Sequence, residues 1–266
     1  MKATDFEFDG KKLSDFGMMI CRFGSNGLET ISDGSVITFN TISTLGGTKH
    51  QLTSTEYEEC LEATIQICKN SCYGDVQEIS ETEHRQLTRW LNRKKYLKLK
   101  ILSEGYMDLY FEASFNISKI ELDGRLFGLE LQVVTNRPFA LQEPKTITIT
   151  NTENNGKHSL NDISCEEGFI YPYTEITIDA LTGGDLTIHN AMENRSTYIG
   201  NCSYGEVITM DYPVIQSSIS SHKIENDFNW NFFRVANTYD NSRNDLTISL
   251  PCSIKVTYSP IVKVGL

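Results

Sequence analysis

A succession of short β-type segments constrains the fold of this chain more than any other feature of its sequence. In the second half, β-branched and aromatic residues recur in short runs that Gly, Asn and Asp separate. Runs of this composition at regular spacing are typical of the strands of an antiparallel β-sandwich. The predicted strands are Thr146–Thr150, Thr174–Asp179, Asp185–His189, Glu206–Met210, Phe232–Val235, Leu246–Leu250 and Ser253–Tyr258.

The first half also contains strand patterns. In Glu59–Lys69, apolar residues alternate with more polar ones, which predicts a half-buried strand with Leu61, Ala63, Ile65 and Ile67 on its inner side. Other segments have the same period or composition. They are the region around Phe6 and Phe8, then Leu13–Ile20, Val36–Phe39, Tyr96–Leu102, Met107–Ile117 and Leu126–Thr135.

One helix is predicted near residues 80–94. Ser80 and Glu83 form a capping box, in which each side chain satisfies a free backbone N–H of the first turn. Leu87, Trp90 and Leu91 follow at the spacing of one helical face, so we expect them to pack into the core. The helix should end near Arg93–Lys95.

A boundary between two domains is predicted near residue 142. Pro138 and Pro144 interrupt any regular element there, and the pattern changes from a helix-containing half to an all-strand half. With 266 residues the chain is long enough for two domains. We therefore predict a mainly β protein, with a β-rich domain at 1–142 that contains one α-helix and an antiparallel β-sandwich at 143–266.

The charge distribution argues against specific nucleic-acid binding. The formal net charge is −11, whereas phosphate contacts need a broad basic face. One basic segment, Arg85 to Lys100, contains no acidic residue. It can be read as a solvated helix C-terminus, where cations are favoured. Alternatively, Arg85, Arg89 and Arg93 contact an acidic surface of a neighbouring subunit.

The seven cysteines are scattered and form no disulfide framework. Met1 is followed by charged residues and not by an apolar segment, so no signal peptide is predicted. No apolar run approaches the roughly 18 residues that a membrane span needs. We expect synthesis in a cytoplasm, reduced cysteines and no membrane insertion.

No enzymatic motif is present, and we predict no catalytic residue, cofactor or metal. There is no nucleophile elbow, phosphate loop or zinc-binding helix. For three weaker groupings of residues, ordinary structural roles are the simpler explanation. The groupings are Cys68, Cys72 and His84 as a zinc site, Glu166, Glu167, Asp179 and Asp185 as a hydrolase pair, and Tyr171, Tyr173, Tyr204 and Trp230 as sugar-stacking residues.

Several segments, taken in order, give the chain a resemblance to the distal tail proteins of long-tailed, non-contractile phages. In the first half they are F-x-F-D-G-K-K-L-S-D-F-G-M-M-I (Phe6–Ile20), R-Q-L-T-R-W-L-N-R-K (Arg85–Lys94) and V-V-T-N-R-P-F-A (Val133–Ala140). In the second half they are L-T-I-H-N (Leu186–Asn190), G-E-V-I-T-M-D (Gly205–Asp211), F-N-W-N-F-F-R (Phe228–Arg234) and I-K-V-T-Y-S-P (Ile254–Pro260).

The resemblance implies a ring-forming N-terminal domain, a galectin-like C-terminal sandwich and assembly into a homohexameric ring. Such a ring would join the tail tube protein to the tail-tip hub or receptor-binding protein, in a virion tail assembled in the host cytoplasm. The W-x-x-E-x-R pattern of true galectins is absent, because Asn-Phe-Phe-Arg follows Trp230. The alternative is a carbohydrate-binding adhesin of the tail or the cell surface.

Overall fold

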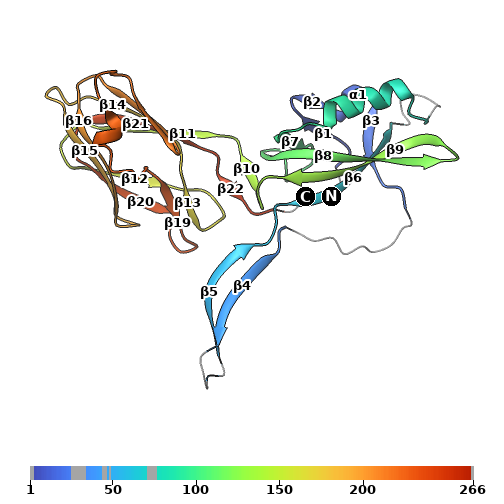
Figure 1. Ribbon diagram of the computed structural model, residues 1–266, viewed down its shortest axis with the longest axis horizontal. Coiled ribbons are helices and arrows are strands. Elements are labelled where there is room, and N and C mark those ends of the chain that lie inside the picture. Colours follow the sequence, from blue (N-terminus) through green and yellow to red (C-terminus); the bar gives the residue numbers. More distant parts are fainter. Residues whose placement is uncertain (1–2, 25–33, 44–46, 48, 71–76, 265–266) are drawn as a thin grey trace. The chain divides into compact units, whose positions relative to one another are not determined.

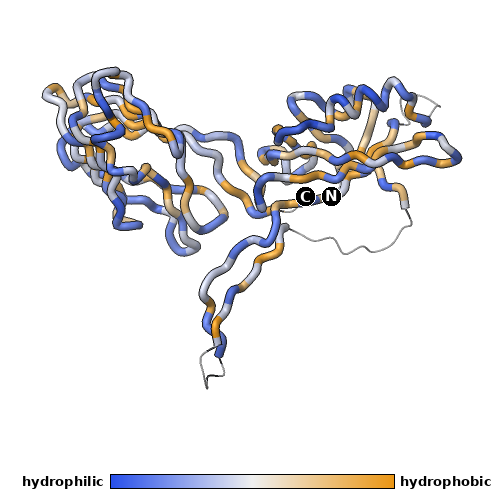
Figure 2. The backbone as a smooth tube through the Cα atoms, viewed as in Figure 1, coloured by the Kyte–Doolittle hydropathy of each residue, from blue (hydrophilic) through white to orange (hydrophobic). Residues whose placement is uncertain are grey.

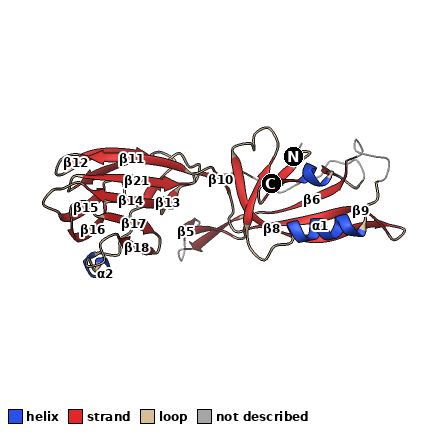
Figure 3. Ribbon diagram, turned by 90° about the horizontal axis from the view of Figure 1, so that it is seen from above, coloured by secondary structure: helices blue, strands red, loops and turns tan. Residues whose placement is uncertain are grey.

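The computed structural model describes residues 3–24, 34–43, 47, 49–70 and 77–264, and it divides the chain into two compact units. The first comprises Met1–Gln142 together with Val262–Leu266, and the second comprises Glu143–Ile261. Strands dominate both units, which confirms the predicted mainly β fold class. Figure 3 shows how little helix accompanies them. No helix among the described residues is long and apolar enough to cross a membrane.

The first unit is built on one antiparallel sheet with the order β2-β1-β7-β8-β9-β6-β3 (Figure 1). Short strands β10 (Ala140–Gln142) and β22 (Ile261–Val262) pair with each other, and β10 also pairs with β8. The strands of the main order are β1 (Phe6–Phe8), β2 (Lys11–Lys12), β3 (Met18–Cys21), β6 (Glu62–Lys69), β7 (Leu97–Ile101), β8 (Leu109–Leu122) and β9 (Arg125–Thr135).

The turn between β8 and β9 shows how the sequence sets the sheet. Asp123 and Gly124 both adopt positive φ, 50° and 75°, as a tight hairpin turn requires. The register then places Phe115 opposite Val133 and Ile117 opposite Leu131. On β6, Ile65 and Ile67 are buried and Ala63 packs against the same core, which confirms the predicted inner side of that strand.

Helix α1 (Glu81–Leu91) begins with the predicted capping box. Ser80 Oγ accepts from the backbone N–H of Glu83, and the Glu83 carboxylate accepts from the N–H of Ser80. Leu87, Trp90 and Leu91 are buried in the core, as predicted. The helix ends at Leu91 with Asn92 as its cap, so the predicted end near Arg93–Lys95 was wrong.

Two other expectations for the first unit need correction. Leu13–Phe16 forms a turn of 3₁₀ helix, which Gly17 ends at φ 69°, so the predicted strand Leu13–Ile20 begins only at Met18. The second difference is a two-stranded sheet of β4 (Ile37–Ser43) and β5 (His50–Tyr57), which is separate from the main sheet. We call this ribbon the arm, and its second strand was not predicted.

The second unit is a β-sandwich. One sheet has the order β11-β21-β14-β17-β18 and the other β12-β20-β15-β16, with a small β13-β19 pair beside them. Side chains from both sheets share one core, for example Ile176 and Ile254 from the first and Ile188 and Ile248 from the second. This is the packing expected of two facing sheets.

The strands of the second unit, in chain order, have the following bounds. They are β11 (Lys145–Asn151), β12 (Gly156–Asn161), β13 (Gly168–Ile170), β14 (Tyr173–Ile178), β15 (Gly184–Asn190), β16 (Arg195–Cys202), β17 (Val207–Asp211), β18 (Val214–Ser217), β19 (Val235–Asn237), β20 (Arg243–Ile248) and β21 (Cys252–Tyr258). Of the predicted Phe232–Val235, only Val235 is in a strand. A short helix, α2 (Ile224–Asp227), was not predicted.

Candidate assembly interface

The arm has one apolar and one polar face. Its register sets Ile37 opposite Tyr57 and Phe39 opposite Thr55, and after a bulge Leu52 lies opposite Thr41. Residues directly opposite each other point to the same side, and successive residues alternate. The face that we call apolar carries Ile37, Phe39, Leu52 and Tyr57, with Thr41 and Thr55 between them. The polar face carries Thr38, Asn40, Ser54 and Glu56, and near its end the exposed Ile42 opposite Gln51.

Hydrogen bonds hold the polar face together. Asn40 Nδ2 donates to Ser54 Oγ at 3.1 Å and to Glu56 Oε1 at 3.0 Å. On the other side, Phe39 is 64% exposed and Leu52 is 57% exposed. Figure 2 shows apolar residues of the arm, in orange, among polar ones. The apolar side is therefore open to solvent in the single chain.

No other strand of the described residues extends the two-stranded sheet of the arm. Within the described residues, neither β4 nor β5 pairs with a third strand, so each has a free edge. A two-stranded ribbon is at best marginally stable alone in water, and exposed apolar patches commonly mark interaction sites. The arm has the properties of an element that another surface covers.

The basic segment belongs to the same unit, where α1 packs against β8 of the main sheet. Arg85 and Arg89 are exposed on α1, and no ion pair to either of them is present in the described part of the chain. Arg93 follows the helix, and its guanidinium lies 3.3 Å from the Asp9 carboxylate. Thus two of the three predicted contact residues are unpaired on the helix, and the third is tied to its own unit.

A shallow hollow of about 280 Å³ adjoins the basic segment. Arg93, Lys94 and Lys95 line one part of it, and Ser114 and Asn116 of β8 line another. The Ser114 hydroxyl donates to the Arg93 carbonyl at 2.6 Å, which fixes the chain after the helix against the sheet. The hollow therefore presents cations on a fixed backbone.

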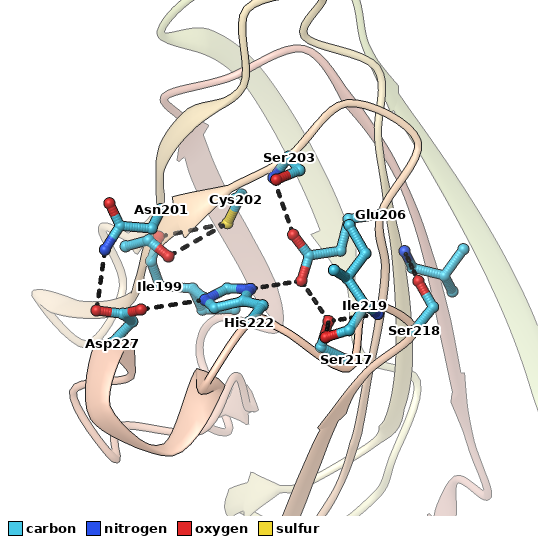
Figure 4. A network of polar contacts seen from close by, with 12 residues as sticks. Ile199, Asn201, Cys202, Ser203, Glu206, Ser217, Ser218, Ile219, His222 and Asp227 are labelled. Carbon is cyan, nitrogen blue, oxygen red and sulfur yellow. Dashed lines mark hydrogen bonds and ion pairs between the residues drawn. The ribbon is translucent and has the colours of Figure 1, made fainter.

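A network of polar contacts lies in the second unit (Figure 4). Glu206 is fully buried and accepts hydrogen bonds from the Ser217 hydroxyl and the backbone N–H of Ser203. His222 Nδ1 lies 2.5 Å from Glu206 Oε1, and its Nε2 lies 3.3 Å from Asp227 Oδ2. The Nδ1 contact is a hydrogen bond, whereas Nε2 approaches Asp227 without forming one within the described residues.

This cluster stabilises the fold and gives no access to a substrate. The His222 side chain is only 5% exposed and Glu206 is not exposed at all. Desolvation alone would raise the pKa of Glu206, but the bonds from Ser217, Ser203 and His222 outweigh it and lower that pKa. The network ties α2 and the turn before β17 together. Sequence reasoning missed it, because no motif joins residues that only the strand topology brings together.

The sequence-based catalytic groupings do not converge on a site. Asp185 accepts hydrogen bonds from the Tyr198 hydroxyl and the Asn201 N–H. Glu166 and Glu167 line a separate hollow of about 350 Å³. For the zinc grouping, Cys72 lies outside the described residues. Within the described part of the chain, no group of three His, Cys, Asp or Glu side chains could hold a metal ion.

The aromatic residues considered for sugar stacking are divided between core and surface. Tyr171 stacks on Tyr212 at 4.2 Å, and Tyr212 meets Phe232 edge to face at 5.3 Å. Trp230 packs beside Phe228 but is 58% exposed. Tyr173 and Tyr204 are exposed and make no ring contact with the others in the described residues. No single sugar platform unites these four predicted residues.

Both halves of the chain match family models of phage tail proteins. Residues 1–137 match the family model described as phage tail protein N-terminal domain, and residues 139–258 match the phage tail C-terminal domain. No curated protein matches the chain in sequence.

Two solved structures match the chain over most of its length. The crystal structure of the SPP1 Dit protein, described as a paradigm of the hub adsorption apparatus in phages that infect Gram-positive bacteria, has a TM-score of 0.62 at 12% identity. That match covers 97% of this chain and 99% of the other. A chain of the phage P2 baseplate, in its activated conformation with Ca, gives a TM-score of 0.44 at 10% identity, with 97% and 98% covered.

Proposed function

Because this chain belongs to the phage tail protein family in both of its domains, we propose that it is a distal tail protein that forms a ring and has no enzymatic activity. The family membership and the shared fold with SPP1 Dit confirm the resemblance drawn from the sequence. As a structural protein of the tail, it acts through the surfaces that it buries against its neighbours.

The main observation that supports a ring is the exposed apolar face of the arm. Its apolar face, with Phe39 and Leu52, is exposed, and no other strand of the described residues pairs with its edges. We propose that a second copy of this chain covers the arm. The arm of one subunit then meets a different surface of the next, and repeated contacts of this kind close into a ring when the rotation fits. Six subunits are the number that we propose.

Charge supports the same arrangement. Arg85 and Arg89 project cations from a chain whose net charge is −11, so a neighbouring copy offers acidic surface to them. Complementary charges set the register of a contact more than its affinity. In this proposal apolar burial of the arm supplies most of the affinity, and Arg85, Arg89 and Arg93 orient the subunits.

The ring would stand between two kinds of neighbour. We propose that one side receives the tail tube protein and the other the tail-tip hub or receptor-binding protein, so that the protein resides in the virion tail. The SPP1 Dit protein, which shares this fold, is part of a hub adsorption apparatus, and this supports the placement. In this proposal the second unit is a galectin-like sandwich that serves as a structural module.

Sedimentation velocity of paired variants tests the role of the arm. Leu52→Asp places a charge on the apolar face, and Gln51→Asp places the same charge on the adjacent residue of the polar face. We expect Leu52→Asp, and equally Phe39→Asp, to shift the protein from ring to monomer. Gln51→Asp should assemble like the wild type. Equal assembly of all three variants would contradict the proposed role of the arm.

A further inference from the structure

Two cysteine thiols meet on the outer face of the first sheet, next to the strand that leads into the arm. Strand β3 pairs antiparallel with β6, with Cys21 opposite Gln66 and Met19 opposite Cys68. Residues 21 and 68 are therefore diagonal neighbours on the same face of the pair. Met18 and Ile20, the alternate residues of β3, contact the core, so the thiols point away from it.

The two thiols are close enough to influence each other. Burial and the neighbouring Cys68 thiol together raise the pKa of Cys21. Both cysteines are free and half-buried. Among the remaining described cysteines, Cys60 and Cys165 are exposed, and Cys202 and Cys252 belong to the core of the second unit.

Phe23 partly covers this face. Its backbone N–H donates to Gln66 Oε1 at 2.8 Å, which directs the chain back across the sheet after β3. Its ring occupies the space that a side chain at residue 128 would fill, because a Cβ on Gly128 would lie 2.4 Å from the ring. Gly128 is the β9 partner of Cys68. The Phe23 ring therefore lies on the same face as the two cysteines, beside the β9 partner of Cys68.

We propose that Cys21 and Cys68 form a disulfide bond that fastens strand β3 to β6 at the base of the arm. The bond closes a loop that contains the whole arm, since the chain leaves β3 at Cys21 and re-enters the sheet at β6. Strand β3 makes only four residue pairs at the edge of the sheet.

The chemistry requires an oxidant, which we take to be a small-molecule disulfide such as oxidised glutathione. One protein thiolate attacks a sulfur of the oxidant, forms a mixed disulfide and releases one glutathione thiol. The second thiolate then attacks the protein sulfur of that mixed disulfide and releases the second glutathione thiol. Two protein thiols are oxidised, and one molecule of oxidant is reduced to two thiols.

The bond should be reversible. Diagonal neighbours across a strand pair are about 7–8 Å apart between Cα atoms, whereas disulfides need about 4.4–6.8 Å. The short edge strand β3 therefore has to move closer, and the resulting strain makes the bond easier to reduce. Disulfides persist on virion surfaces and not in a reducing cytoplasm. The bond should therefore form after the virion is released from the host. This timing rests on the proposed function.

Peptide mapping of the full chain tests the bond. The protein is incubated with oxidised glutathione, remaining thiols are alkylated with iodoacetamide, and tryptic peptides are analysed by mass spectrometry without reduction. We expect Leu13–Arg22, which contains Cys21, linked to His50–Lys69, which contains Cys68. Because His50–Lys69 also contains Cys60, mapping is done in Cys60→Ser as well, and the link should persist there.

A thermal readout accompanies the mapping. Oxidation should raise the melting temperature of the wild type and of Cys60→Ser by about 5 °C, because a closed loop has less entropy to gain on unfolding. Cys21→Ser and Cys68→Ser should show no rise. Full alkylation of both thiols, glutathione adducts without a link, or a link from Cys21 to the Cys72 peptide would each overturn the proposal. None of these results bears on ring formation, which sedimentation measures separately.

Discussion

The indole N–H of Trp90 donates a hydrogen bond to the carbonyl oxygen of Phe8 at 2.9 Å, and so joins α1 to the strand at the start of the chain. The indole also stacks on Phe16 at 4.4 Å and on Phe6 at 5.8 Å. This contact closes the first unit between elements 82 residues apart. It makes Trp90 the side chain on which the packing of the helix depends most.

Trp90→Ala should therefore destabilise the first unit by roughly 3–5 kcal/mol, the range for removal of a buried large aromatic side chain. Denaturant unfolding followed by circular dichroism measures this change. Trp90→Phe keeps a ring but loses the hydrogen bond to the Phe8 carbonyl, and it should cost about 0.5–1.5 kcal/mol. A change within experimental error for Trp90→Ala would show that the helix is held by other contacts.

Gly156 lies where any larger residue would displace a buried asparagine. A Cβ there would lie 1.9 Å from Asn151 Oδ1, while Asn151 Nδ2 donates to the carbonyl oxygens of Glu153 and Leu250. Gly156→Ala should cost about 1–3 kcal/mol, because the displaced amide leaves buried groups unpaired. Gly24→Ala, which meets no atom within 4 Å, is the control and should melt like the wild type.

Glu206 should make the second unit sensitive to acid. Its pKa in the folded protein is lowered from the ordinary value of 4.5. A lowered pKa contributes stability that is fully present above about pH 4.5 and is lost as the pH falls through the folded value. Melting temperatures between pH 7 and pH 3 should fall for the wild type. Glu206→Gln should be less stable at pH 7 and should lose less on acidification; a parallel decline would contradict this assignment.

Reversal of the free helix arginines should weaken assembly in a salt-dependent way. The double variant Arg85→Glu/Arg89→Glu leaves the Arg93–Asp9 ion pair intact, so the monomer fold should be preserved. Each rim charge pair contributes only about 0–1 kcal/mol, so the loss should be evident at low salt and small at high salt. Sedimentation at both salt concentrations measures it. Unchanged assembly at low salt would remove this surface from the interface.

Short sequence patterns predicted the elements that are defined by residues close together in the chain. The capping box at Ser80 and the apolar spacing of Leu87, Trp90 and Leu91 define α1, and the alternation in Glu62–Lys69 defines β6. The arm was only half predicted. Its β5 contains a single large aliphatic residue, Leu52, because it has no core to face within the chain, so the usual hydrophobic signal is weak.

In the candidate site, too, local features could be predicted and contacts between distant segments could not. Sequence reasoning grouped Arg85, Arg89 and Arg93 on one helix as a possible assembly contact. It could not show that Arg93 lies beyond the end of α1 and pairs with Asp9. It treated the cysteines as scattered, because the contact between Cys21 and Cys68 depends on β3 pairing with β6 across the arm. Contacts set by strand order are not encoded in any short motif.

Negative-stain electron microscopy of the purified full chain tests the ring most directly. The account predicts closed rings of uniform size with sixfold symmetry, and it predicts that Leu52→Asp abolishes them while Gln51→Asp retains them. Wild-type protein that remains monomeric at high concentration, or that stacks into long tubes with no closed end ring, would contradict the account.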